Sequence, residues 1–495
     1  MKSERIYDSL TNLDDAMIRE ADTAPKRRKR YLPWLGAIAA VLAVAVLAGV
    51  LLRPGGFVIE AHALTLPEYP AAAPYPDLMD YIGENGEISD ADRETYYEKM
   101  NEWYSDDAER QQYRNEYSLQ DLSGFLSKTL PQFLGGTDSE NRVYSPLNVY
   151  MALALLAETA DSTGRQQILD LMGVSDMDTL RTRVHAIWNA NYCDDGVRKS
   201  VLANSLWLND QVNFRQETLD LLAQNYYASS YAGAMGTKQM DDLLHNWMNE
   251  QTDDLLKDQI DALELDDDTV AALVSTVLFT AKWDEEFSES VTTDGVFHAA
   301  NGDEPCRMMH QESEGNYYWA DHFAAVAQNL EGGGSMWFFL PDEGVTPEDL
   351  LHDPQLTAFL LTNGNGNGIW ENQKYLIIQK QIAKFDVASQ IDAKKPLQEL
   401  GVTDVFDWTK ADFSPLTQEA QEYNVYVSDA IHGARVMIDE KGCKGAAYMI
   451  ILEGAGAAEP PDERVDFILD RPFIFAITGT DGLPLFIGIV NHPNV

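Results

Sequence analysis

The sequence predicts an α+β fold for the region from about residue 116 to the C-terminus. Apolar residues repeat at helical spacing in the first part of this region, and strand-like apolar runs dominate the second part. Strands grouped after helices favour an α+β protein, since helices and strands alternate in a doubly wound sheet. Near the C-terminus, an Asp-Gly pair at 481–482 separates two apolar runs and predicts a tight β-hairpin.

The individual elements follow from the same periodicities. Helices are expected at 119–134, 147–158, 163–172 and 214–227. Strands are expected at 275–283, 335–341, 374–387, 434–438, 473–477 and 484–490. The predicted body is therefore a mixed domain whose strands are concentrated towards the C-terminus.

Composition excludes several classes of protein. The chain has 495 residues, is 45% hydrophobic and holds 10 Trp, 22 Tyr and 18 Phe, which excludes a disordered protein. Its formal net charge of −44 opposes binding to nucleic acid. Three widely spaced cysteines indicate neither a disulfide framework nor a CxxC metal site.

An uncharged run at 32–52 predicts a membrane anchor. As a helix it spans about 30 Å, the thickness of a bilayer core, and the basic run 26–30 precedes it. By the positive-inside rule, residues 1–31 are expected in the cytoplasm, 32–52 as a single transmembrane signal anchor, and the rest at the cell surface. A cleaved signal peptide is the alternative, because Ala61, His62 and Ala63 resemble a cleavage site.

Residues 53–115 are acidic and rich in Pro and Tyr. Their first half predicts an extended stalk and their second half a short polar helix. The stalk is expected to lift the body, residues 116–495, off the membrane.

The sequence lacks the common enzyme signatures. It holds no GxSxG nucleophile elbow, no GxxxxGK[ST] phosphate loop and no HExxH pair, and its nine histidines show no paired metal-ligand spacing. We therefore expect no catalytic residue, no metal, no cofactor and no enzymatic activity.

The C-terminal segment carries a dense motif. An F-x-x-D-R-P-F-x-F run leads through the predicted hairpin into L-F-x-G-x-V-x-x-P. The matching residues are Phe467, Asp470, Arg471, Pro472, Phe473, Phe475, Leu485, Phe486, Gly488, Val490 and Pro493. This motif resembles the C-terminal signature of the serpins, and further segments from 116 onward resemble serpin counterparts in the same order. The uncleaved anchor and the few cysteines favour a membrane-anchored, bacterial-type member.

The resemblance implies a fold and a polar cluster. Helices are expected around a large, mostly antiparallel central sheet with two smaller sheets and an exposed reactive loop at about 440–466. Ser145, Asn148, Ser275 and His432 are expected to form the cluster that controls opening of the central sheet. Asn148 stands where the family usually has Ser, and Ser275 where it usually has Asn. The alternative is that these are ordinary buried polar residues satisfied by local partners.

The segment from 440 to 447 resembles the hinge of an inhibitory reactive loop. The hinge residues are Glu440, Gly442, Cys443, Lys444, Gly445, Ala446 and Ala447. Cys443 replaces the usual Thr, and Lys444 the usual Glu. Because strand side chains alternate between faces, positions 443, 445, 447, 449 and 451 share one face, and none is charged. That face is suited to burial in a sheet.

The scissile bond is expected within 453–459. The candidates are Glu453, Ala455, Gly456 and Ala457. Small residues suit an elastase-like protease, whereas Glu453 suits a glutamate-preferring one. No Lys or Arg lies between 445 and 463, which disfavours a trypsin-like target.

The resemblance implies a monomeric inhibitor of serine proteases, or of cysteine proteases. Such an inhibitor traps its target as an acyl-enzyme when the cut loop inserts into the sheet. The alternative is a non-inhibitory surface protein of the same fold that serves binding or adhesion.

Overall fold

The computed structural model of the protein describes residues 62–83, 87–136, 139–363, 370–420, 422–443 and 461–493. These belong to one compact unit, Val58–Val495. The predicted cytoplasmic N-terminus, the predicted anchor at 32–52, hinge residues 444–447 and all four scissile candidates lie outside the described residues. Within the described ranges, no helix is both long and apolar enough to cross a membrane.

The largest sheet has nine strands. In spatial order they are β15 (Arg464–Leu469), β11 (Gln373–Ala383), β8 (Gly302–Trp319), β9 (Phe323–Asn329), β10 (Ser335–Pro341), β16 (Phe473–Thr478), β17 (Pro484–Val490) and β2 (Arg142–Tyr144), with β7 (Thr293–Ala299) paired to β8. All pairs are antiparallel except β11 with β15. The predicted C-terminal hairpin is confirmed as β16 and β17.

A second sheet has six strands and a third has two. The six are β1 (Ala63–Thr65), β5 (Ala228–Gly233), β4 (Lys199–Asn209), β6 (Ala271–Lys282) and β14 (Gly442–Cys443) in order, with β3 (Cys193–Asp194) paired to β4. The two-stranded sheet pairs β12 (Phe385–Asp392) with β13 (Ile431–Ile438). The predicted strand at 374–387 is divided between β11 and β12, because the chain passes from one sheet to another at Lys384.

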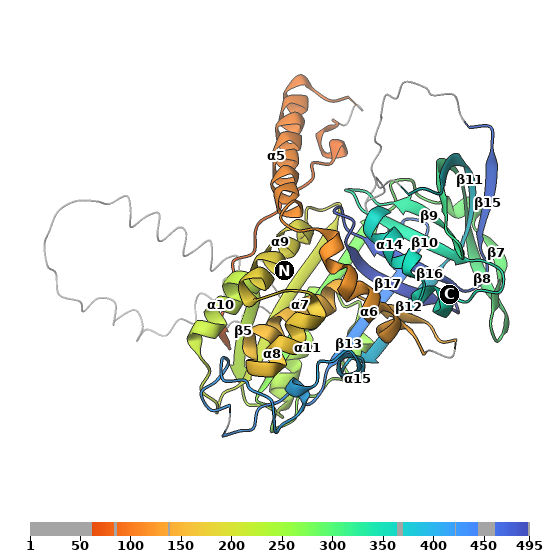
Figure 1. Ribbon diagram of the computed structural model, residues 1–495. Coiled ribbons are helices and arrows are strands. Elements are labelled where there is room, and N and C mark those ends of the chain that lie inside the picture. The colour runs from red at the N-terminus through yellow and green to blue at the C-terminus, as the bar shows by residue number, and fades with distance from the viewer. Residues whose placement is uncertain are drawn as a thin grey trace, which may run out of the picture. The chain divides into compact units, whose positions relative to one another are not determined.

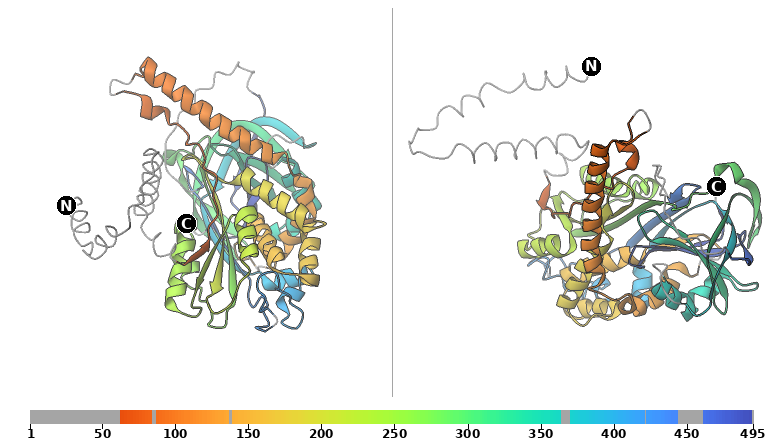
Figure 2. Two further views of the ribbon diagram at one scale, coloured as in Figure 1. Left: turned by 90° about the vertical axis from the view of Figure 1, so that its left-hand side faces the viewer. Right: turned by 90° about the horizontal axis from the view of Figure 1, so that it is seen from above.

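Helices cover both faces of the six-stranded sheet (Figure 2). The described helices after α5 (Asp90–Arg114) are α6 (Ser123–Leu134), α7 (Pro146–Thr159), α8 (Ser162–Met172), α9 (Met177–Asn191), α10 (Gln216–Tyr226), α11 (Lys238–Thr252), α12 (Lys257–Ile260), α13 (Pro347–Leu351), α14 (Pro354–Asn363) and α15 (Lys394–Glu399). Of these, α14 packs on the nine-stranded sheet, where Phe359 contacts Trp337 and Phe339. The four predicted helices correspond to α6, α7, α8 and α10. Helix α7 is almost wholly buried in the main core, whereas α11 packs a separate apolar cluster against Trp207 and Tyr231. The α+β fold with one large and two smaller, mostly antiparallel sheets is therefore confirmed.

The described part of the predicted stalk packs on the body. It contains β1, a 3-10 helix (Leu78–Tyr81) and the predicted polar helix, which is α5 (Asp90–Arg114) and has 25 residues. Strand β1 pairs with β5, and α5 packs against α9 and extends away from the body (Figure 1). Its few inward-facing side chains include Trp103 and Arg110, which explains why the sequence shows a polar helix.

Candidate functional site

Strands β6 and β13 have facing edges that are not paired with each other. The structure describes both strands throughout, and among the described strands β13 pairs only with β12. On the side away from β4, β6 has a described strand partner only at Ala281 and Lys282, where β14 begins. We call the space between these two edges the gap.

The structure brings the four residues of the predicted cluster together at the gap. The Asn148 side-chain Nδ2 donates to the Ser275 backbone O at 2.7 Å and to its Oγ at 3.2 Å. The Asn148 Oδ1 lies 3.1 Å from the His432 Nδ1, so one amide side chain links β6 to β13. Ser145 caps helix α7 and fixes Asn148, whose backbone N–H donates to the Ser145 Oγ at 3.2 Å. We call these four residues the Asn148 cluster.

Hydrogen bonding determines the proton position on His432. The backbone N–H of Ser145 donates to the His432 Nε2 at 3.1 Å, so the ring proton lies on Nδ1 and points to the Asn148 Oδ1. The imidazole is fully buried, and burial lowers the pKa of His432 to about 4. Protonation of Nε2 would place two N–H groups against each other, so the cluster requires a neutral ring.

Asn148 occupies the place of a strand partner. Alternate residues of an antiparallel strand direct their N–H and C=O groups to opposite edges. The Trp283 N–H faces the gap, because it donates to the Lys441 O beside β14. Ser275 is an even number of residues before Trp283, so the Ser275 C=O faces the same edge. A strand that enters the gap must displace the Asn148 amide from this carbonyl.

The other end of the gap holds the predicted hinge. The chain leaves β13 through a turn in which the Asp439 Oδ1 accepts from the backbone N–H groups of Lys441 and Gly442. A Cβ atom at Gly442 would lie 2.4 Å from the Ala281 O, so the backbones approach too closely for any other residue. This turn directs β14 antiparallel to β6.

Cys443 is buried as the second residue of β14. Its side chain is 3% exposed and its register partner is Ala281. Burial raises the pKa of the Cys443 thiol to about 12, which keeps it protonated and apolar in character. The first two hinge residues to leave the turn therefore already occupy the start of a new strand.

The comparisons with known proteins now identify the family. A family model described as "Serpin (serine protease inhibitor)" matches residues 122–493. The chain belongs to the serpin family. It is 26% identical to Serpin-ZX of Arabidopsis thaliana, over 77% of this chain and 99% of the relative, and 28% identical to Alpha-1-antiproteinase 2 of Equus caballus, over 72% and 82%.

Solved structures agree on the fold. The thermophilic serpin tengpin in its native state has a TM-score of 0.64 at 24% identity, with 76% of this chain and 94% of that chain covered. Tengpin in its latent state has a TM-score of 0.62 at 23% identity, with 75% and 96% covered. Residues 62–121 of this serpin precede the family-matched region.

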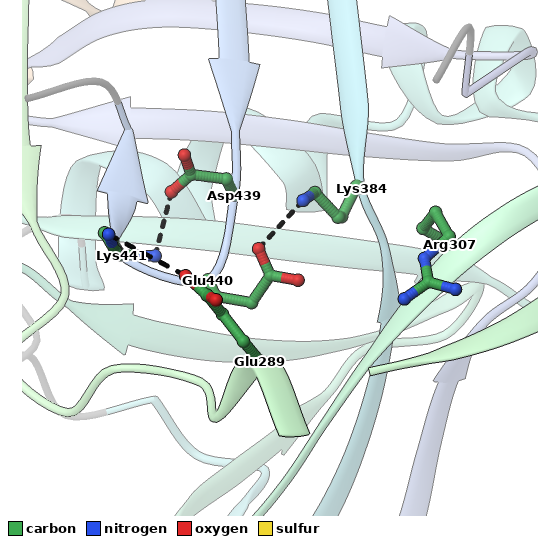
Figure 3. Close-up of a pocket in the computed structure, with 6 residues that line it drawn as sticks. All are labelled: Glu289, Arg307, Lys384, Asp439, Glu440 and Lys441. Carbon is green, nitrogen blue, oxygen red and sulfur yellow. Dashed lines mark hydrogen bonds and ion pairs between the residues drawn. The ribbon is translucent and has the colours of Figure 1, made fainter. Parts of the chain in front are cut away.

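A polar pocket of about 420 Å³ lies beside the hinge (Figure 3). We call it the hinge pocket, and its lining residues are Glu289, Arg307, Lys384, Asp439, Glu440 and Lys441. The Lys384 Nζ donates to the Glu440 Oε2 at 2.8 Å, and the Thr292 Oγ1 donates to its Oε1 at 2.9 Å. Burial alone would raise the pKa of Glu440, but these hydrogen bonds outweigh it and hold the pKa below its usual value.

Sequence reasoning missed the partners of Glu440. Lys384 appears in the segment that resembles its family counterpart, but no local spacing connects it to a residue 56 positions later. Its Nζ reaches the hinge because the chain crosses between sheets at this residue. Lys384 lies inside one continuous strand-like run, so nothing in the sequence distinguishes it from Lys374 and Lys380 of the same run.

Proposed function

We propose that this serpin inhibits serine proteases by trapping them when its cut loop inserts into the gap. The observation that carries the proposal is the pairing of Gly442 and Cys443 with β6, beside an edge that has no other described strand partner. A strand started at this position extends by one residue pair after another if the following side chains fit. The alternate positions from 443 to 451 are uncharged, so one face of such a strand is suited to burial.

The chemistry is supplied by the target. Its nucleophile attacks a loop carbonyl carbon, the peptide bond breaks, and an acyl-enzyme ester links the target to the loop. Insertion then moves the acylated protease before water hydrolyses the ester. The native state is metastable in this scheme, so its lifetime is governed by a barrier rather than by equilibrium stability. The small residues at 454–458 favour an elastase-like target.

Incubation with pancreatic elastase tests the proposal. We expect a covalent complex that survives denaturing electrophoresis, with a released C-terminal peptide that begins between residues 454 and 462. Ala447→Arg is expected to abolish the complex while the loop is still cut, because position 447 shares the uncharged face with Cys443 and insertion would bury an unpaired guanidinium. Ala447→Ser is the matched control and should retain the complex.

The outcomes separate inhibition from its alternative. Complex formation by the wild type and by Ala447→Ser, but not by Ala447→Arg, supports the mechanism. Loop cleavage of the wild type without a complex, and without a gain in thermal stability of the cut protein, contradicts it. That result favours the non-inhibitory binding or adhesion protein.

We further propose that this inhibitor acts at the cell surface as an anchored monomer. The uncharged run at 32–52 and the basic run before it support this location. Membranes from expressing cells should retain the protein through an alkaline carbonate wash, and added protease should digest the body on intact cells. Release by the wash, or protection of the body in intact cells, contradicts the proposed location.

A further inference from the structure

Helix α5 is fastened to the turn between β3 and β4 through a buried carboxylate. The Trp103 Nε1–H donates to the Asp195 Oδ2 at 3.1 Å, and the backbone N–H of Tyr75 donates to the Asp195 O at 2.7 Å. Asp195 is 1% exposed and also accepts from the backbone N–H of Arg198 at 2.8 Å. Because Trp103 and Tyr75 both precede the family-matched region, residues outside the family core complete this buried site.

Arg198 connects this site to the nine-stranded sheet. Its guanidinium is 4% exposed and lies 3.8 Å from Asp195 and 4.0 Å from Asp107 of α5. The Arg198 Nη1 donates to the Gly332 O, in the turn between β9 and β10, at 2.7 Å. Helix α5 therefore helps to hold an arginine that joins the start of β4 to the other sheet.

The contact between Arg198 and the β9–β10 turn, which we call the junction, lies beside the hinge. The backbone N–H of Glu331, next to Gly332, donates to the Lys282 O at 2.9 Å, and Lys282 is the register partner of Gly442. Strand β6 pairs with β4 at ten consecutive positions, from Thr280 with Lys199 to Ala271 with Leu208. If the gap widens, β6 moves together with β4, and the Arg198 contact with the β9–β10 turn must yield.

The segment is fastened on the other side of this junction as well. The Tyr117 hydroxyl, three residues after α5, donates to Asp481 in the turn between β16 and β17. At its beginning, β1 pairs with the outer edge of β5, and Tyr69 stacks on Trp188 and Tyr192 of the body. Residues 62–117 thus contact the six-stranded sheet and the nine-stranded sheet on both sides of the junction.

We propose that residues 62–117 form a strap that holds the six-stranded sheet against the β9–β10 turn and delays loop insertion in the uncut protein. The strap extends the lifetime of the active inhibitor. This inference rests on the proposed function, because it requires a loop that can insert. Loss of one fastening lowers the barrier to spontaneous insertion without altering the loop or the gap.

Conservative variants of the full chain test the strap. Trp103→Phe removes the indole N–H and keeps an aromatic ring beside Tyr75, and Tyr117→Phe removes only the hydroxyl. Glu109→Gln, on the exposed face of α5, is the matched control. The uncut proteins are incubated warm and sampled on urea-gradient gels, where a monomer with an inserted loop stays compact at urea concentrations that unfold the native form.

We expect each of the two strap variants to convert to the inserted-loop form at a rate about tenfold higher than that of the wild type. This ratio corresponds to the loss of one hydrogen bond to a charged group. If Trp103→Phe and Tyr117→Phe both convert at the rate of Glu109→Gln, the proposal that residues 62–117 delay insertion is overturned. Unfolding or aggregation in place of conversion also overturns it, because that result indicates a purely structural role.

The same samples after loop cleavage by elastase separate the two hypotheses. If all cut proteins gain urea resistance but the uncut variants convert no faster, only the strap fails. If the cut wild type gains no resistance, the loop does not insert, and the proposed function fails as well.

Discussion

The two ends of the gap hold their strands by different means. At the Asn148 cluster, neutral side chains and backbone groups are joined by hydrogen bonds around a fully buried His432. At the hinge pocket, charges are paired: the buried Glu440 carboxylate accepts from Lys384, whose side chain is 25% exposed. Removal of the Asn148 amide leaves the buried His432 N–H without its described partner, whereas the partly exposed Lys384 ammonium can still be solvated when Glu440 is changed. If the loop inserts as proposed, we expect insertion to start at the hinge and to meet its main barrier at the Asn148 cluster.

Removal of the Asn148 amide is expected to have the largest effect. Asn148→Ala leaves the Ser275 carbonyl and the His432 Nδ1–H without their described partner. Because the His432 N–H is buried and the Ser275 carbonyl lies at a partly exposed position, we expect a loss of about 3 kcal/mol in the free energy of unfolding of the native form. Chemical denaturation checks this, with the exposed Gln166→Ala of α8 as control. Equal stability of the two variants would remove the distinction between the ends of the gap.

Acid is expected to weaken the same cluster through His432. The folded-state pKa is lowered to about 4, below the ordinary value of 6.5, so the unfolded chain takes up a proton first. Stability from this group is complete above pH 6.5 and is lost as the pH falls towards 4, by about 3 kcal/mol in total. His432→Gln should show a smaller loss across this window. An identical pH profile for the variant and the wild type would contradict the assignment.

The hinge pocket is expected to contribute the smallest effect. Glu440→Gln weakens the contact with Lys384 and should cost about 1 kcal/mol, because the Gln oxygen can still accept a hydrogen bond and the Lys384 side chain is 25% exposed. The cost should decrease as salt is added. Glu289→Gln is the matched control, since its pairing with Lys441 is longer, at 3.7 Å, and both side chains are exposed. A larger loss for Glu440→Gln than for Asn148→Ala would reverse the comparison.

The elements could be predicted from the sequence because their periodicity is local. Helix α7 follows from apolar spacing, and the C-terminal hairpin follows from Asp481 and Gly482 between two apolar runs. The split of the run 374–387 into β11 and β12 could not be predicted, since strand-like residues continue on both sides of Lys384. Which strands pair is determined by contacts distant in sequence, and periodicity carries no information about them.

The site was predicted in part. The resemblance singled out Ser145, Asn148, Ser275 and His432, and the structure brings these four together; their control of sheet opening stays a prediction. The sequence did not predict that the described strands would leave the facing edges of β6 and β13 unpaired over most of their length. The fastenings of the strap were also missed, because Trp103 meets Asp195 across 92 positions and nothing in a polar helix sequence marks that contact.

The central claim is that the gap accepts the loop as a strand that continues β14. The most direct measurement is the melting temperature of the protein before and after elastase cuts the loop, with cleavage confirmed by mass spectrometry. The account predicts a large rise on cleavage, because the inserted strand would pair with β6 and β13 along facing edges that have few described strand partners. An unchanged melting temperature in a fully cut sample would contradict it.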